Sequence, residues 1–130
     1  MKNLLTVLPL TLFIAACASN PTTHTTTTNT STNKAYDRMA PERFVCEDNA
    51  TVMPKYSIDG EQAIVTASLP KANWNNQNLT MTIAPSGSGA RYVNSDNPNV
   101  TYEWHTKADS GLMGVKWANG NEYIVNCERQ

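Results

Sequence analysis

Apolar and polar residues alternate along most of the chain after residue 43. The pattern is clearest in residues 63–69, where every second residue from Ala63 to Leu69 is apolar. The same period of two recurs in residues 79–84, 100–105, 113–117 and 123–127. Because successive side chains of a strand point to opposite faces of a sheet, this pattern predicts β-strands with one apolar face. No segment has the 3.6-residue spacing of a long amphipathic helix.

Turn signals separate these segments. Asp59-Gly60 and Asn119-Gly120 are typical of type I′ hairpin turns, in which both central residues have positive φ. Pro85-Ser86-Gly87-Ser88-Gly89 predicts a glycine-rich bend. Further short strands are expected in residues 44–46, 52–58 and 90–93, which brings the total to about eight. The sequence therefore predicts an all-β domain, a small antiparallel β-barrel or flattened barrel.

The large side chains on the predicted strands are expected to fill the barrel. Ile83 lies on the apolar face of its segment, together with Leu79 and Met81. The aromatic side chains are expected in the core, where they would bury large areas, instead of forming a platform for a ligand. They are Tyr102, Trp104, Trp117 and Tyr123.

The first residues of the chain have a different composition. Residues 1–16 combine a basic start with a short apolar stretch, which is typical of a secretory signal and too short to span a bilayer. The stretch ends in Ile14-Ala15-Ala16-Cys17, which resembles the lipobox of bacterial lipoproteins. The resemblance implies a signal peptide in residues 1–16 and a lipid on Cys17. Ala18, in place of an aspartate, implies sorting to the outer membrane, with the domain in the periplasm or at the cell surface.

The chain is thus expected to have three parts. After the signal peptide, residues 17–35 contain the lipidated cysteine and a threonine-rich segment that has too few apolar residues to fold, so we expect a flexible tether. Residues 36–130 contain the barrel. Ten basic and eleven acidic residues give a net charge of −1, with no basic stripe, so no nucleic-acid partner is expected.

Two further cysteines, Cys46 and Cys127, lie near the two ends of the predicted barrel. In a small exported domain, two cysteines are expected to form a disulfide. We expect it to join the first and last strands. Closing the long loop between residues 46 and 127 should stabilise the fold by roughly 4–5 kcal/mol in the chain-entropy model.

Few residues have the spacing of a catalytic or metal site. His24 and His105 lack metal-ligand spacing, and His105 is expected on a solvated strand face. The loop around Ser88 is neither a nucleophile elbow nor a phosphate loop, and a triad of Ser88, His105 and Asp109 has no support beyond the residue types. An enzyme is the least favoured class, and no cofactor, metal or catalytic residue is expected.

Two segments carry a resemblance to a known family. Taken alone, Ser86-Gly87-Ser88-Gly89-Ala90-Arg91-Tyr92 is a glycine-rich turn, and Trp104-His105-Thr106-Lys107 is a strand that ends in an exposed lysine. The first is similar to a signature of the membrane-bound and periplasmic inhibitors of c-type lysozyme, which often read Ser-Ala-Ser-Gly-Ala-Arg-Tyr. The second resembles that family's lysine motif, although Ala108 stands where the family commonly has glycine. The resemblance covers roughly residues 42–129.

This resemblance implies an eight-stranded barrel that blocks c-type lysozyme by inserting Ser88 and Lys107 into the enzyme's cleft. Gly87 and Gly89 would shape the loop, and Arg91 and Tyr92 would support it from behind. The implied partners are c-type lysozyme and, through Cys17, a membrane. Two alternatives remain open: an adhesin or envelope-interaction lipoprotein that uses the same barrel, and a small-ligand binder of the calycin type. The sequence also leaves open whether the protein forms a homodimer.

Overall fold

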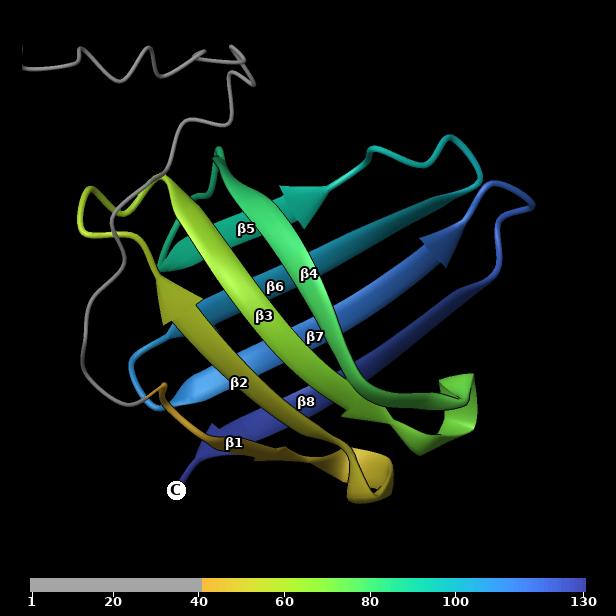
Figure 1. Ribbon diagram of the computed structural model, residues 1–130, viewed down its shortest axis with the longest axis horizontal. Helices are drawn as coiled ribbons and strands as arrows, with labels where there is room; N and C mark the ends of the chain where they lie inside the picture. Colours follow the sequence, from red (N-terminus) through yellow and green to blue (C-terminus); the bar gives the residue numbers. More distant parts are fainter. Residues whose placement is uncertain (1–40) are drawn as a thin grey trace, which may run out of the picture. The chain divides into compact units, whose positions relative to one another are not determined.

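The alternating segments fold into a closed antiparallel barrel of eight strands in the part of the chain that the structure describes (Figure 1). This structure is a computed structural model and describes residues 41–130. The predicted signal peptide, the tether with Cys17 and the first residues of the predicted 36–130 domain lie outside the described residues. The prediction of an all-β antiparallel barrel is confirmed.

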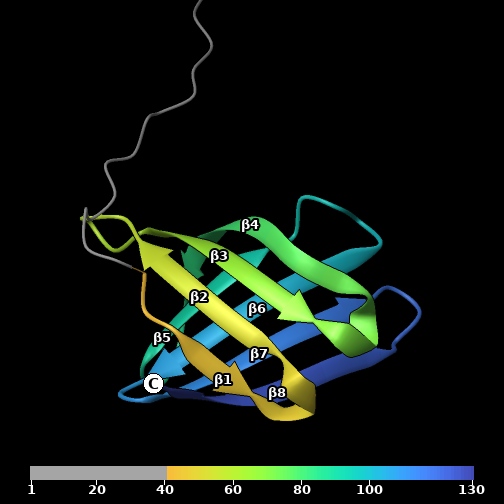
Figure 2. The same cartoon turned by 60° about the horizontal axis from the view of Figure 1, so that its bottom comes forward.

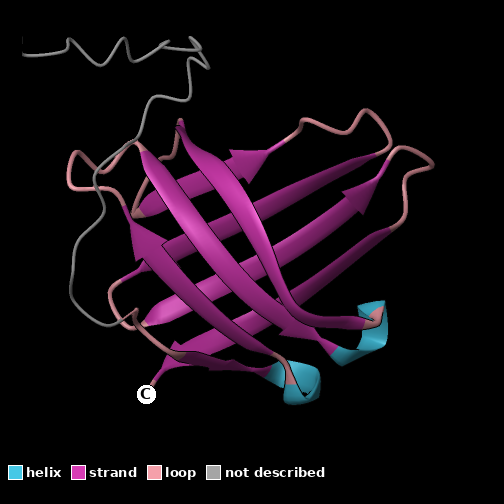
Figure 3. Cartoon of the chain, in the orientation of Figure 1, coloured by secondary structure: helices cyan, strands magenta, loops and turns pink. Residues whose placement is uncertain are grey.

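The strands follow one another around the barrel in sequence order. They are β1 (Phe44–Cys46), β2 (Thr51–Tyr56), β3 (Gln62–Leu69), β4 (Trp74–Ala84), β5 (Ala90–Asn94), β6 (Val100–Lys107), β7 (Ser110–Trp117) and β8 (Glu122–Arg129). Two short 3₁₀ segments, η1 (Glu47–Asn49) and η2 (Pro70–Ala72), follow β1 and β3 and are the cyan elements in Figure 3. No helix among residues 41–130 is long and apolar enough to cross a membrane.

Strand β4 is longer than the alternating pattern indicates. It begins at Trp74, although the polar residues 75–78 give no period of two. Gln77 and Asn78 pair with Ala67 and Thr66 of β3, and an irregularity in the ladder, where Asn76 has a φ of +48°, separates them from the Trp74–Leu69 pair. The Thr66 hydroxyl also donates a 2.7 Å hydrogen bond to the Asn78 side chain. Pairing between strands, which a local pattern does not report, thus sets the length of β4.

The barrel closes where β1 meets β8, and the two strands lie side by side in both views (Figures 1 and 2). The ladder is short, with three residue pairs, and its last pair is Cys46 opposite Cys127. These two cysteines form the disulfide, across a sequence separation of 81 residues. Both are buried. The predicted disulfide between the first and last strands is therefore confirmed.

Trp104 is the largest fully buried side chain and lies among side chains from several strands. Its ring packs edge-on against Phe44 at a centroid distance of 5.0 Å. Its indole N–H donates a 2.9 Å hydrogen bond to the Tyr56 hydroxyl. Burial raises the pKa of Tyr56 to about 12, so this hydroxyl stays neutral. Gly111 leaves room for the tryptophan, because a Cβ at this position would lie 2.2 Å from the ring.

Two residues predicted for the core are exposed instead. Trp117 is 39% exposed and Ile83 is 42% exposed. Each lies at or next to the end of its strand. Tyr102 and Tyr123 are partly buried and pack against the core, and Trp104 is fully buried. Strand parity therefore predicted the correct face of each strand but not the depth of burial of each side chain.

The two predicted type I′ turns are also wrong. Gly60 and Gly120 have positive φ (72° and 90°), but Asp59 and Asn119 do not. Each turn is centred one residue earlier, so the glycine N–H donates to the carbonyl of Ser57 or Trp117 at 2.9 Å. The side chains of Asp59 and Asn119 explain the difference, because each accepts a hydrogen bond from the backbone N–H two residues later.

Reduction of the disulfide should destabilise the protein strongly. We expect the Cys46→Ala/Cys127→Ala variant to lose roughly 4–5 kcal/mol of unfolding free energy, because the unfolded chain is no longer closed into a loop. Thermal unfolding followed by circular dichroism, with and without reductant, measures the change. A midpoint that does not move on reduction would show that the short β1–β8 ladder closes the barrel by itself.

Candidate functional site

The two sequence motifs meet at a depression on the outside of the barrel. The β4–β5 loop supplies Ser88, β6 supplies His105 and Lys107, and β7 and β8 supply the floor and far side. The full lining is Ser88, His105, Lys107, Ser110, Gly111, Leu112 and Asn126. Ser88 and Lys107, which the sequence placed at the partner-binding site, therefore lie at one surface feature and are both exposed.

Gly89 packs directly onto the strand that carries the lysine. Its φ is +67°, and a Cβ there would lie 2.3 Å from the Thr106 carbonyl oxygen and 2.9 Å from the Lys107 Cβ. Only glycine fits this conformation and this close approach. Gly87 differs, since it does not have positive φ and a Cβ there would meet nothing within 4 Å. Of the two glycines predicted to shape the loop, the structure requires a glycine at Gly89.

His105 holds the loop from the neighbouring strand. Its Nε2 lies 2.8 Å from the Ser88 carbonyl oxygen and 3.2 Å from the Ser86 hydroxyl. The Ser86 hydroxyl itself donates to the Ser88 carbonyl at 2.6 Å. Because a carbonyl oxygen only accepts, we assign the proton to Nε2. His105 thus lies on the outer strand face, as predicted, and from there holds the backbone of Ser88.

The sequence contained a pattern that places His105 on the same face as Lys107. His105 and Lys107 are two residues apart on one strand, so their side chains point to the same outer face. The catalytic triad remains unsupported, because His105 contacts the Ser88 carbonyl and not its hydroxyl. Asp109 pairs with Arg129 at 2.9 Å. Within residues 41–130, no group of three or more His, Cys, Asp or Glu side chains is arranged to hold a metal ion.

Arg91 and Tyr92 lie on opposite faces of β5. Arg91 points outward and makes two hydrogen bonds, of 2.9 and 3.0 Å, to the carboxylate of Glu103 on β6. These hydrogen bonds lower the pKa of Glu103 and raise that of Arg91. Tyr92 points inward, is 4% exposed and donates a 2.9 Å hydrogen bond to the Gly60 carbonyl. Burial raises the pKa of Tyr92. Sequence reasoning did not single out Glu103.

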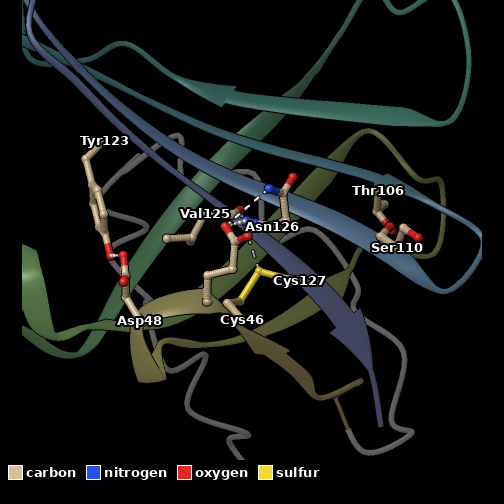
Figure 4. Close-up of a disulfide and its surroundings, with 9 residues drawn as sticks. Cys46, Asp48, Thr106, Ser110, Tyr123, Val125, Asn126 and Cys127 are labelled. Carbon is tan, nitrogen blue, oxygen red and sulfur yellow. Dashed lines mark hydrogen bonds between the residues drawn. A yellow bond between two sulfur atoms is a disulfide. The ribbon is translucent and has the colours of Figure 1, made fainter.

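The disulfide seam lies directly beside the depression. Figure 4 shows Asn126, a lining residue, one position before Cys127 on β8. The Asn126 backbone N–H and side-chain amide both donate to the Glu47 carboxylate, at 3.1 and 3.2 Å. In the same region Asp48 accepts from the Tyr123 hydroxyl at 3.1 Å (Figure 4) and from Lys71 at 2.7 Å. The hydrogen bond from Lys71 lowers the pKa of Asp48.

Together these features define a small disulfide-closed barrel that presents a glycine loop and an exposed lysine at one surface depression, as a protein-binding module does. The family described as membrane-bound lysozyme inhibitor of c-type lysozyme matches residues 44–122, and the chain belongs to this family. The match confirms the resemblance noted in the sequence. The family consists of inhibitors, so the chain is not an enzyme, and the family name indicates a membrane-bound protein. Searches of curated proteins and of solved structures gave no match.

The two loop glycines should respond differently to substitution. We expect Gly89→Ala to lose about 1–3 kcal/mol of unfolding free energy, because the new Cβ adds left-handed strain and overlaps the Thr106 carbonyl. Gly87→Ala is the matched control, with a change within about 0.5 kcal/mol. Urea unfolding of both variants measures the difference. Equal effects would show that the loop does not pack on β6 as described.

The Arg91–Glu103 pair should make stability depend on pH in the acid range. The pKa of Glu103 is lowered below its usual value of about 4.5, so the pair stabilises the fold above that pH. The contribution is lost as pH falls through the lowered pKa. We expect Glu103→Gln to be about 1 kcal/mol less stable near neutral pH, because Arg91 is partly exposed and solvent screens the pair. The difference should vanish in strong acid.

Denaturant unfolding across the acid range, with the exposed Glu122→Gln as a control, measures this dependence. A constant difference between the protein and Glu103→Gln at all pH values would contradict the assignment of the shift to the ion pair.

Proposed function

We propose that this protein inhibits c-type lysozyme by placing Ser88 and Lys107 in the enzyme's catalytic cleft. The observation that carries the proposal is the packing of Gly89 against Thr106 and Lys107, which brings the loop and the lysine to one depression. A protruding loop beside a long cationic side chain has a shape suited to a cleft. Because the loop is held by His105 before any partner binds, little ordering is required on binding.

The chemistry of the two side chains matches the target. Lysozyme cleaves peptidoglycan with two carboxyl groups, of which one is held protonated and the other is ionised. Lys107 supplies a compact ammonium group with three donors, suited to the ionised carboxylate. Ser88 supplies a hydroxyl that both donates and accepts, suited to the protonated acid. With both groups engaged, no water or sugar reaches them and hydrolysis stops.

Supporting residues would act on the shape of the loop. Gly89 permits the close approach to β6, and His105 holds the Ser88 carbonyl, which fixes the position at which the loop backbone presents the serine. Arg91 joins β5 to β6 through Glu103 on the same outer face. Tyr92 would support the loop from the barrel interior, where its side chain is buried. Gly87, at the exposed tip, leaves the loop narrow enough to enter a cleft.

The location of the protein is a further part of the proposal. We infer that Cys17 carries a lipid, that the anchor is in the outer membrane, and that the threonine-rich residues of the 17–35 segment hold the barrel away from the lipid surface. The membrane-bound character of the family and the lipobox-like residues support this inference. An inhibitor held there would protect peptidoglycan from lysozyme that enters the envelope.

Lysis of isolated cell walls by c-type lysozyme, followed by turbidity, tests the proposal. The full chain, purified in mild detergent, should prevent lysis. Lys107→Ala should weaken inhibition by about 1–4 kcal/mol, as expected for a buried interface hot spot. Lys116→Ala, which removes another exposed lysine from the neighbouring strand β7, is the matched control and should inhibit as the unchanged protein does.

A g-type lysozyme in the same assay controls for nonspecific effects on the cell walls, and its activity should not change. Full inhibition by Lys107→Ala would rule out the proposed role of the lysine. Absence of inhibition by the unchanged chain at micromolar concentration would rule out the function itself.

A further inference from the structure

The turn after Lys107 has an unusual backbone conformation. Lys107 and Ser110 are the closing pair of the β6–β7 hairpin, so the turn consists of Ala108 and Asp109. Ala108 has a φ of +51°. Side chains with a Cβ are disfavoured in this region, because the Cβ comes close to the following carbonyl oxygen. Such a conformation persists only where surrounding contacts hold it.

Arg129, near the end of β8, makes those contacts. Its Nη2 donates to the Ala108 carbonyl oxygen and lies close to the Asp109 carboxylate, at 2.9 Å in both cases. Its backbone N–H donates to the Asp109 carbonyl at 2.8 Å. Both residues of the turn are therefore bound by one residue of another strand. Arg129 lies outside the 44–122 segment that matches the family.

The guanidinium group is itself held in place. Its Nη1 donates to the Glu42 carboxylate at 2.9 Å. Two positions earlier on β8, Cys127 is bonded to Cys46, which fixes the strand. The planar guanidinium group binds both the Glu42 carboxylate and the turn, so its donors keep one geometry. A lysine at this position would not reproduce that geometry.

We propose that Arg129 is a positioning residue for Lys107: it holds the Ala108-Asp109 turn in the conformation that sets the direction of the lysine. Lys107 is the last residue of β6, so the backbone path immediately after it decides where its side chain points. Without Arg129, Ala108 relaxes to negative φ, and Lys107 samples directions outside the cleft. This inference rests on the proposed inhibitory role of Lys107.

The test measures the affinity of the full chain in detergent for immobilised c-type lysozyme. Arg129→Met keeps much of the side-chain length and removes every side-chain donor, so we expect binding to weaken about tenfold. Glu128→Gln is the matched control, because it removes a neighbouring exposed carboxylate from β8 and leaves every side-chain contact of Arg129 in place. It should change affinity less than about twofold. Thermal midpoints of all variants show that they are folded, and Arg129→Lys replaces Arg129→Met if the latter does not fold.

Two further readouts separate positioning from general stability. In the Lys107→Ala background, Arg129→Met should have almost no additional effect, because the residue it positions is already gone. Adding Ala108→Gly to Arg129→Met should restore part of the affinity, because glycine adopts positive φ without strain. Additive losses in the double variant, no recovery with Ala108→Gly, or a loss in Glu128→Gln as large as that in Arg129→Met would each overturn the inference.

The two proposals fail in different ways. If Lys107→Ala binds lysozyme normally, the proposed function of the lysine fails. If Lys107→Ala is weakened and Arg129→Met binds normally, only the positioning role of Arg129 fails.

Discussion

The closure of the barrel at the β1–β8 seam is the constraint on which the rest of the structure depends. Strand β1 has three residues and pairs with β2 at only two positions, and that ladder ends two residues before Pro54, which has no N–H to donate. A strand with so few paired residues is held only weakly by its neighbours in the sheet. The Cys46–Cys127 bond, between residues that face each other across the seam, fixes β1 to the last strand of the sheet.

Closing the seam also fixes the face that carries the candidate site. Strand β8 carries Asn126, which lines the depression, and Arg129, which binds the turn after Lys107. On the other side of the depression, the loop is fixed by Gly89 against β6 and by His105 against the Ser88 carbonyl. Ser88 and Lys107 are thus held by separate contacts that share one framework. A binding surface arranged in this way loses little conformational entropy when it meets a rigid partner.

Much of the fold was predictable because its signals are local. Period-two alternation located the strands, and the three cysteines together with the expected export pointed to the disulfide. The errors arose where a neighbouring group decides the outcome. The Asp59 and Asn119 side chains moved their turns by one residue, and pairing with β3 lengthened β4. Trp117 has the parity of a core residue but lies at the end of its strand and is 39% exposed, a depth of burial that the alternation does not report.

The candidate site likewise combines features that the sequence predicted with contacts that only the structure reveals. The resemblance supplied Ser88 and Lys107, and the structure brings them to one depression. The contacts that hold them, from His105, Glu103 and Arg129, cross between strands and were not visible along the chain. The requirement for glycine at Gly89, and its absence at Gly87, likewise depends on where Thr106 lies.

The central claim is that the chain occupies the catalytic cleft of c-type lysozyme, and competition with a cleft-binding oligosaccharide tests it most directly. The affinity of the full chain for lysozyme would be measured at increasing concentrations of an oligosaccharide that fills the cleft and is hydrolysed slowly. Occupation of one site predicts that the apparent Kd rises linearly with the free oligosaccharide concentration, from its value without oligosaccharide. An apparent Kd that stays constant when the oligosaccharide saturates the enzyme would show that the chain binds elsewhere on lysozyme and would contradict the account.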